Sequence, residues 1–181
     1  MKKQGYEMEY VKIEDSGKRS FGQKKNHTII FVTGGRGYLY QEEEKDVCTM
    51  EDLIFIKPGN KVNLEYRKNK YPLELYVLYV GTELLRSLSD ENTKLDEAFD
   101  VVPFQVKTVH SESGSAMLIK NISKKLYAMI KETPKFAHTL YEKSLLTMLL
   151  VLALRASVQE DVQRKSDMKK HVVMDDIFIY I

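Results

Sequence analysis

The side chains best suited to metal or nucleophilic chemistry in this chain are four histidines and one cysteine. A metal site built on β-strands needs imidazole and carboxylate ligands that converge from two neighbouring strands. The four histidines are far apart in the sequence: they are His27, His110, His138 and His171. No second histidine stands near His27, and none directly follows the Pro58-Gly59 pair. We therefore expect neither a metal site nor a cofactor.

The single cysteine, Cys48, lies in a strand-like run, where a cysteine usually acts as a small buried hydrophobic residue. Neither a Cys-His pairing nor a nucleophile elbow can be read from the sequence. The glycine-rich segment Gly34–Gly37 joins two strand-like runs, so it predicts a β-hairpin and not a phosphate-binding loop. We expect the chain not to be an enzyme. A small isomerase or dioxygenase is the alternative, which stoichiometric metal in the purified protein would revive.

Binding a small molecule requires fewer specific residues than metal or nucleophilic chemistry does: a concave, mostly apolar pocket with a few polar groups is enough. Period-two alternation places two sets of side chains on one face of their strands. These sets are Thr28, Ile30 and Val32, and then Val62, Leu64 and Tyr66. Such faces either line a pocket or form a core. Tyr76 could stack on a sugar, or the eleven tyrosines replace the absent tryptophan in packing.

Short strands must position these residues. From Tyr6 to about Val80, apolar runs of strand length end in turn-forming residues, with no helical period between them. This pattern favours antiparallel hairpins over βαβ units. A short helix is expected at Glu83–Leu88, then a polar loop, and then an edge strand at Val101–Val109, which contains a proline. The predicted fold class is α+β, mainly β: an antiparallel barrel followed by a C-terminal helical pair.

The helical pair begins after Ser113. In its first helix, apolar residues recur every three to four positions, at Met117/Leu118, Ile122, Leu126 and Met129/Ile130. Thr133-Pro134 ends that helix and starts the next one, which runs from Lys135 to about Ser157. This second helix becomes apolar on every side, so we expect a second copy of the chain to cover part of it. Burial within a monomer is the alternative. The predicted dimerisation residues are Leu140, Leu145, Met148, Leu149 and Leu152.

Composition sets the cellular context. The 28 basic and 26 acidic residues give a charge of +2, which makes no global electrostatic case for nucleic acid or membrane. The longest apolar run, Leu145–Leu154, is shorter than the roughly 20 residues that span a bilayer. The N-terminus lacks a signal-peptide pattern, and one cysteine fits a reducing compartment. We expect a soluble, cytoplasmic protein without a membrane partner.

Three motifs together resemble one family. A strand reaches Thr33–Gly37, a later strand reads Glu51-Asp52-Leu53-Ile54-Phe55-Ile56-Lys57-Pro58-Gly59, and a leucine-rich helix follows the barrel. This order resembles the cupin-like ligand-sensing half of AraC-type transcription regulators. Glu51 stands where the family usually has glycine, and Lys57 stands where it often has proline. The end of the chain, Met174–Ile181, is similar to the first helix of the family's DNA-binding domain.

The resemblance implies a sensor barrel over residues 1–110, a helical dimerisation element over 111–158, and a linker with the start of a missing DNA-binding domain over 159–181. The implied function is effector binding and dimerisation, with a sugar or related metabolite sensed in the barrel. The chain would form a homodimer and reach DNA only through the missing domain. An arm that precedes the barrel would bring Arg19 to the effector. A ligand-free dimerisation scaffold is a further alternative. The predicted ligand-binding residues are Arg19, Phe21, Thr28, Ile30, Val32, Val62, Leu64, Tyr66 and Tyr76.

Overall fold

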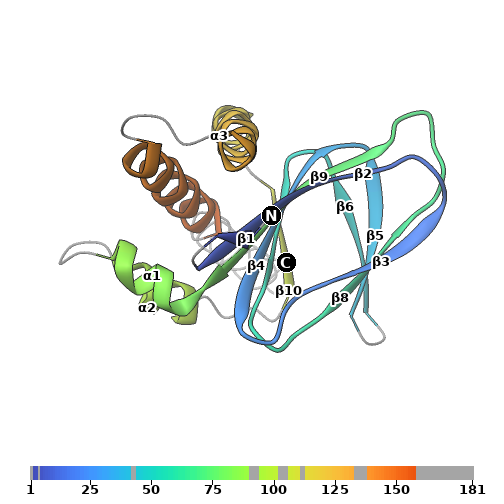
Figure 1. The fold of residues 1–181 in the computed structure, drawn as a ribbon. Helices are drawn as coiled ribbons and strands as arrows, with labels where there is room; N and C mark the ends of the chain where they lie inside the picture. Colours follow the sequence, from blue (N-terminus) through green and yellow to red (C-terminus); the bar gives the residue numbers. More distant parts are fainter. Residues whose placement is uncertain are drawn as a thin grey trace, which may run out of the picture.

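The structure is a computed structural model that describes residues 2–3, 5–41, 44–89, 94–101, 106–110, 113–132 and 138–157. Two antiparallel sheets face each other, and a layer of helices covers the far side of the larger sheet (Figure 1). The predictions for Thr133-Pro134 and for residues 159–181 lie outside the described residues. The predicted fold class, mainly antiparallel β-structure with cupin-like sheets followed by helices, is confirmed.

The larger sheet has six strands, and its middle strands are buried on both faces. Residues 53–56 of one middle strand are therefore apolar without interruption, because helices cover one face and the second sheet covers the other. All of its neighbouring strands are antiparallel. In spatial order the strands are β1 (Lys2–Lys3), β2 (Tyr6–Ile13), β9 (Leu73–Gly81), β4 (Asn26–Gly34), β7 (Asp52–Ile56) and β10 (Val106–His110).

The smaller sheet has four strands, and only one of its faces is buried. On β8, Val62 and Leu64 point into the space between the sheets, while Glu65 between Leu64 and Tyr66 stays partly exposed. Among the described residues no strand pairing joins this sheet to the larger one, so the barrel is a two-layered, open one. In spatial order the strands are β3 (Gly17–Phe21), β8 (Val62–Tyr66), β5 (Arg36–Gln41) and β6 (Glu44–Thr49).

Two predictions about connections are wrong. The segment Lys18–Phe21 is not an arm that precedes the barrel; it belongs to β3, which pairs with β8. Gly34–Gly37 does not form a hairpin, because β4 and β5 belong to different sheets and do not pair. The chain instead turns a corner at Gly35, whose φ is +75°. A Cβ atom there would lie 2.3 Å from the carbonyl oxygen of Pro72, so the corner requires glycine.

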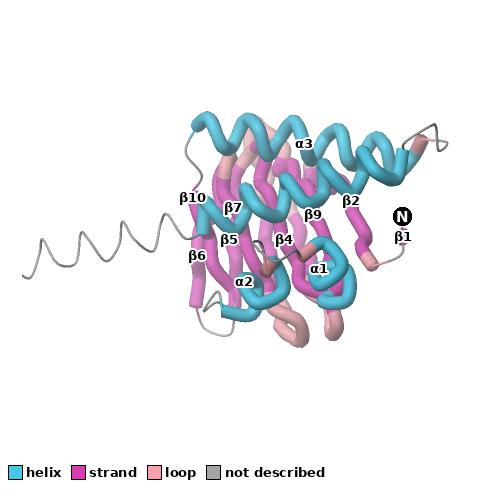
Figure 2. The backbone as a smooth tube through the Cα atoms, turned by 90° about the vertical axis from the view of Figure 1, so that its left-hand side faces the viewer, coloured by secondary structure: helices cyan, strands magenta, loops and turns pink. Residues whose placement is uncertain are grey.

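The helices lie on one side of the larger sheet, and the two long ones both cross its strands (Figure 2). They are α1 (Thr82–Leu88), α2 (Leu95–Val101), α3 (Ser113–Lys131) and a last helix over residues 138–157, drawn in orange-brown in Figure 1. The helix α1 agrees with the prediction, but α2 stands where a polar loop was expected. Only Leu95 and Phe99 of α2 are buried, which is too short a pattern for the sequence to reveal.

The buried face of α3 differs from the predicted one in its first turns. Met117 and Leu118 are 67% and 44% exposed, whereas Ala116 and Ile119 are buried against the sheet. From Ile122 onward the predicted residues do face the core. The error arises because a small alanine marks the true face in the first turn, and larger apolar side chains stand beside it.

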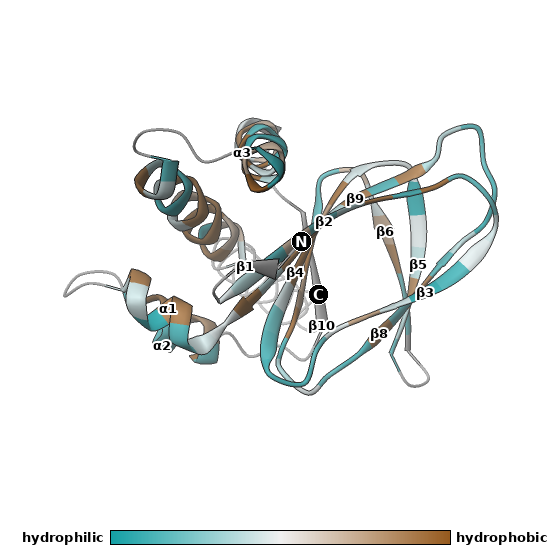
Figure 3. Cartoon of the chain, viewed as in Figure 1, coloured by the Kyte–Doolittle hydropathy of each residue, from teal (hydrophilic) through white to brown (hydrophobic). Residues whose placement is uncertain are grey.

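The last helix buries one side and leaves an apolar strip on the other. Leu145, Leu146, Leu149 and Leu150 pack against the sheet and α3, and Figure 3 shows how apolar the helix is. One hydrogen bond also ties this helix to β2. The Tyr6 hydroxyl donates this hydrogen bond to Glu142. Within the helix, His138 Nε2 lies 3.4 Å from the same carboxylate, one turn earlier. Burial and this carboxylate raise the pKa of Tyr6 above its usual range.

Candidate functional site

The space between the sheets contains most of the predicted ligand-binding residues. Their side chains come from β3, β4 and β8, and each is at most 1% exposed. These side chains pack closely against one another, although Thr28 also borders a cavity of about 10 Å³. Close packing of this kind agrees with the alternative that the domain is a ligand-free dimerisation scaffold. An effector could enter between the sheets only if some of these side chains moved. The residues brought together here are Phe21, Thr28, Ile30, Val32, Val62, Leu64 and Tyr66.

Arg19 lies at the seam between the two sheets. Its Nη2 atom is 2.6 Å from Oε2 of Glu9 on β2, and its guanidinium carbon is 5.2 Å from the centroid of the Phe21 ring. The Tyr79 hydroxyl donates to the other oxygen of Glu9 over 2.9 Å. Burial and this carboxylate raise the pKa of Tyr79. Glu9, Arg19 and Tyr79, which we call the rim cluster, thus join the larger sheet to the smaller one.

A groove of about 960 Å³ opens at the end of the inter-sheet space. Its walls continue the interior, since Gly22 follows the buried Phe21 and Lys61 precedes the buried Val62. Three lysines contribute positive charge, and Glu7 and Glu83 contribute negative charge. None of these five side chains forms an ion pair within the described part of the chain. The lining residues are Gly5, Tyr6, Glu7, Gly22, Gln23, Lys24, Lys25, Asn26, Lys61, Gly81, Thr82 and Glu83.

Tyr76 is not brought together with the other predicted ligand-binding residues. It lies on the opposite face of β9, where its ring centroid is 5.1 Å from that of Tyr10 and 5.9 Å from that of Tyr127 on α3. The three rings contact one another and leave no space for a sugar between them. Tyr76 therefore joins the sheet to α3, in line with the packing role considered for the tyrosines.

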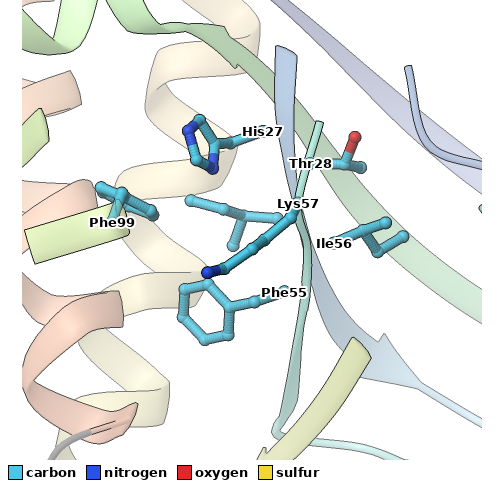
Figure 4. Close-up of a pocket in the computed structure, with 7 residues that line it drawn as sticks. His27, Thr28, Phe55, Ile56, Lys57 and Phe99 are labelled. Atoms are coloured by element: carbon cyan, nitrogen blue, oxygen red, sulfur yellow. The ribbon is translucent and has the colours of Figure 1, made fainter. Parts of the chain in front are cut away.

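His27 lies on the helix side of β4, away from the inter-sheet space. Figure 4 shows its ring beside Phe99, with Thr28 on the other side of the strand. The ring centroids of His27 and Phe99 are 5.5 Å apart, next to a cavity of about 10 Å³ that has room for one water molecule. Within the described residues, no three His, Cys, Asp or Glu side chains are placed to share a metal ion.

Burial lowers the pKa of His27, and the nearby Asp100 carboxylate opposes this shift only in part. The folded protein therefore prefers the neutral ring, while the unfolded chain takes up a proton near pH 6.5. Stability is complete above that pH and falls as the pH drops below it, by at most about 1.4 kcal/mol per pH unit. His27→Leu should flatten this part of the profile. Urea unfolding at several pH values tests it, and an unchanged slope in the variant would contradict it.

The predicted dimerisation residues lie on two sides of the last helix. Leu145 and Leu149 are buried within the chain, whereas Leu140 and Met148 are 69% and 48% exposed. Leu152 is half-buried. The exposed side carries a shallow groove of about 530 Å³, lined by Lys143, Ser144, Thr147, Met148, Val151, Leu152 and Arg155. No helix in the described part of the chain is long and apolar enough to cross a membrane.

Sequence reasoning missed the rim carboxylate and the groove. Glu9 alternates with buried residues on β2, so its side chain could have been placed on the inner face with Val11. The groove had no such signal, because its lysines come from two connections, one before β4 and one before β8. Only the fold brings Lys24, Lys25 and Lys61 to one opening.

Known proteins share this architecture. Apo ToxT from Vibrio cholerae is 11% identical, with a TM-score of 0.58, over 90% of this chain and 57% of that chain. ToxT with a bound unsaturated fatty acid is 11% identical, with a TM-score of 0.56, over 90% of this chain and 56% of that chain. The AraC-like transcriptional activator CuxR is 9% identical, with a TM-score of 0.54, over 83% of this chain and 52% of that chain. The chain thus spans little more than half the length of these proteins, and the likeness at such identities shows the fold.

The sequence itself identifies the family. No curated protein sequence matches the chain. The family described as AraC-like ligand binding domain, however, matches residues 15–150, which is most of the chain. The family consists of ligand-binding domains of transcription regulators and not of enzymes, so both the resemblance and the expectation of a non-enzyme are confirmed. The chain belongs to the AraC-like ligand-binding domain family.

Proposed function

We propose that this chain is the effector-binding and dimerisation part of a cytoplasmic AraC-type transcription regulator. Contact with specific DNA sites would be made by sequence outside the chain. One observation supports the site most directly: an apolar inter-sheet space is bordered by the rim cluster and by the groove, which are neighbours because Glu7 of the groove pairs with Tyr79 of the rim cluster. An effector could insert there and keep its polar end near water.

The lining favours an amphipathic acid as the effector. The inner-face residues Ile30, Val32, Val62 and Leu64 offer no hydrogen-bonding side chains, and Thr28 and Tyr66 add only two hydroxyl groups. A sugar in this space would therefore lose most of its hydrogen bonds to water. An aliphatic chain would lose nothing by the same transfer. The lysines of the groove and Arg19 suit an anionic head group. A sugar, the class predicted from the sequence, stays a prediction, and the fatty acid bound to ToxT supports an acid.

Entry of such a molecule would change two contacts. Phe21 is 1% exposed and closes the end of the interior, so its ring must turn aside. Arg19 would exchange the Glu9 carboxylate for that of the effector, which keeps the guanidinium paired. Glu9 would retain its hydrogen bond from Tyr79. Loosening the Glu9–Arg19 contact would free β3 from β2 and let the sheets part.

The experiment is a thermal-shift and calorimetric screen of long-chain fatty acids, the matching fatty alcohols and sugars. We expect acids to bind, alcohols to bind more weakly, and sugars not to bind. Arg19→Gln should weaken acid binding about tenfold, because a charge-assisted hydrogen bond contributes about 1.5–3 kcal/mol and partial exposure reduces that value.

Arg67→Gln is the matched control. This arginine also forms an ion pair on the smaller sheet, with Glu65, but the pair lies on the sheet's outer side. Its replacement should leave acid binding unchanged. Sugars that bind better than acids would contradict the proposed effector class. Equal losses in the two variants would show that the rim cluster is not part of the site.

We also propose that the chain forms a homodimer through the exposed strip of the last helix. The strip includes Leu140, Met148 and part of Leu152, continues beside a shallow groove, and is not covered by any other described element. Apolar side chains clustered on one exposed helix face are typical of an interface between helices.

A further inference from the structure

The outer face of the smaller sheet carries an unusual set of side chains. Figure 1 shows this sheet on the side of the molecule away from all described helices, so nothing described covers its outer face. Alternation along the strands fixes which residues lie there, because their neighbours Leu39, Cys48 and Leu64 point inward. The outer-face residues are Lys18 and Ser20 on β3, Asn63 and Glu65 on β8, Arg36, Tyr38 and Tyr40 on β5, and Lys45, Val47 and Thr49 on β6.

The strand register places the two tyrosines in neighbouring rows at the centre of this face. Tyr38 lies between Glu65 and Val47, and Tyr40 lies between Asn63 and Lys45. Both rings stand on β5, two residues apart, so they are separated by about 7 Å along the strand. They are only partly buried. The centre of the face therefore offers two aromatic surfaces side by side.

Cations surround these rings. Lys45 Nζ lies 4.4 Å from the Tyr38 centroid and 5.7 Å from that of Tyr40. The guanidinium carbons of Arg67 and Arg36 lie 5.1 Å and 5.7 Å from Tyr38. Lys18 Nζ, 5.8 Å from the Tyr40 centroid, completes the set.

The cations outnumber the carboxylates on this face. Glu65 pairs with both Arg67 and Lys18, over 2.9 Å and 3.4 Å. Arg36 and Lys45 form no ion pair within the described residues. The whole chain has a charge of only +2, yet four cations and one carboxylate gather here. The four cations and one carboxylate around the two rings therefore give the centre of this uncovered face a local excess of positive charge.

We propose that this face binds single-stranded nucleic acid, with bases stacked on Tyr38 and Tyr40 and phosphates beside the four cations. Aromatic rings on an exposed antiparallel sheet, with basic side chains around them, match what an unpaired strand offers: flat π-surfaces joined by negative charges. Base stacking on an aromatic ring is stronger than a cation–π contact at an exposed site. A base could thus displace Lys45 from Tyr38 and release it to a phosphate.

Other polyanions would contact the cations of this face but not the two tyrosine rings. An acidic peptide would pair with the cations but has no flat groups for the tyrosines. A DNA duplex hides the faces of its bases in the stack and presents only phosphates and base edges. The proposal is independent of the effector site, which lies between the sheets and at the rim, so either can fail alone.

Fluorescence anisotropy of the full chain with labelled oligo-dT, oligo-U, an abasic strand and a duplex of equal length tests the proposal. We expect the single strands with bases to bind at least about tenfold more tightly than the duplex or the abasic strand. Tyr38→Leu and Tyr40→Leu should each weaken binding about fivefold or more and leave the salt dependence unchanged. Lys45→Gln and Arg36→Gln should each reduce the salt slope by about one.

A matched control exists in the loop after β8. Tyr71 is 63% exposed and has Lys70 Nζ 5.4 Å from its centroid, so it is a similar pair away from the face. Tyr71→Leu should leave binding unchanged. Equal thermal unfolding of the variants shows that they fold. The proposal is overturned if no strand binds, if the duplex or abasic strand binds as tightly, or if a poly-glutamate peptide competes as well as oligo-dT.

Discussion

Replacing Leu140 and Met148 together by glutamate is expected to convert the protein into a monomer that remains folded. Both side chains are largely exposed within one chain, so the substitution costs the monomer little. In a dimer through the last helix, four carboxylates would enter an apolar interface without partners, and each buried unpaired charge costs several kcal/mol. Sedimentation velocity at micromolar concentrations measures the outcome.

Two controls separate dimerisation from folding. Met117→Glu with Leu118→Glu changes two exposed apolar residues on α3, outside the proposed strip, and should leave the dimer intact. Leu149→Glu buries a charge inside the monomer, where the wild-type side chain is 5% exposed, and should unfold the protein. A wild-type protein that sediments as a monomer would remove the dimer from the proposed function and leave effector binding unaffected.

Gly35→Ala should lower the free energy of unfolding by about 3 kcal/mol, more than most single substitutions. Two effects add at this corner. The φ of +75° strains any residue with a Cβ, and that atom would lie 2.3 Å from the carbonyl oxygen of Pro72, so backbone must move. Urea unfolding measures the loss, and the dependence on urea should stay constant if only the native state changes.

Substitutions at two other glycines separate the two effects. Gly59 has φ +86° but open space around its Cβ position, so Gly59→Ala should show the strain alone, about 1–2 kcal/mol. At Gly34 the nearest atom to a new Cβ would be 3.6 Å away, and Gly34→Ala should change stability by less than about 1 kcal/mol. Equal losses at the three positions would show that the corner does not depend on the contact with Pro72.

Much of the fold could be predicted because the order of apolar and polar residues along a strand indicates which of its faces are buried. Residues such as Val62 and Leu64 alternate with polar ones where one face is exposed, and residues 53–56 form a continuous apolar run where both faces are covered. The same alternation correctly predicted that Thr28, Ile30 and Val32 share one face of β4, and that Val62, Leu64 and Tyr66 share one face of β8. The strand β3 was missed as a strand because Gly17 through Ser20 are all exposed and show no apolar pattern.

The rest of the site could not be predicted from local patterns. Arg19 was singled out, but its pairing with Glu9 joins two sheets, and no rule of spacing predicts which strands meet at a seam. The outer face of the smaller sheet is a similar case. Tyr38 and Tyr40 could be placed on one side of β5, whereas the approach of Lys18 and Arg67 depends on the pairing of β5 with β8 and of β8 with β3.

The two faces of β2 have a mechanical consequence. Tyr6 ties one face to Glu142 on the last helix, and Glu9 ties the other face to Arg19 on β3. A slip of one residue along β9 would exchange the two faces, so small sliding steps are not open to this strand. We therefore expect β2 either to keep its present register with β9 or to separate from β9 altogether. A molecule that pairs with Arg19 would then act on β2 through Glu9, and not by sliding the strand along β9.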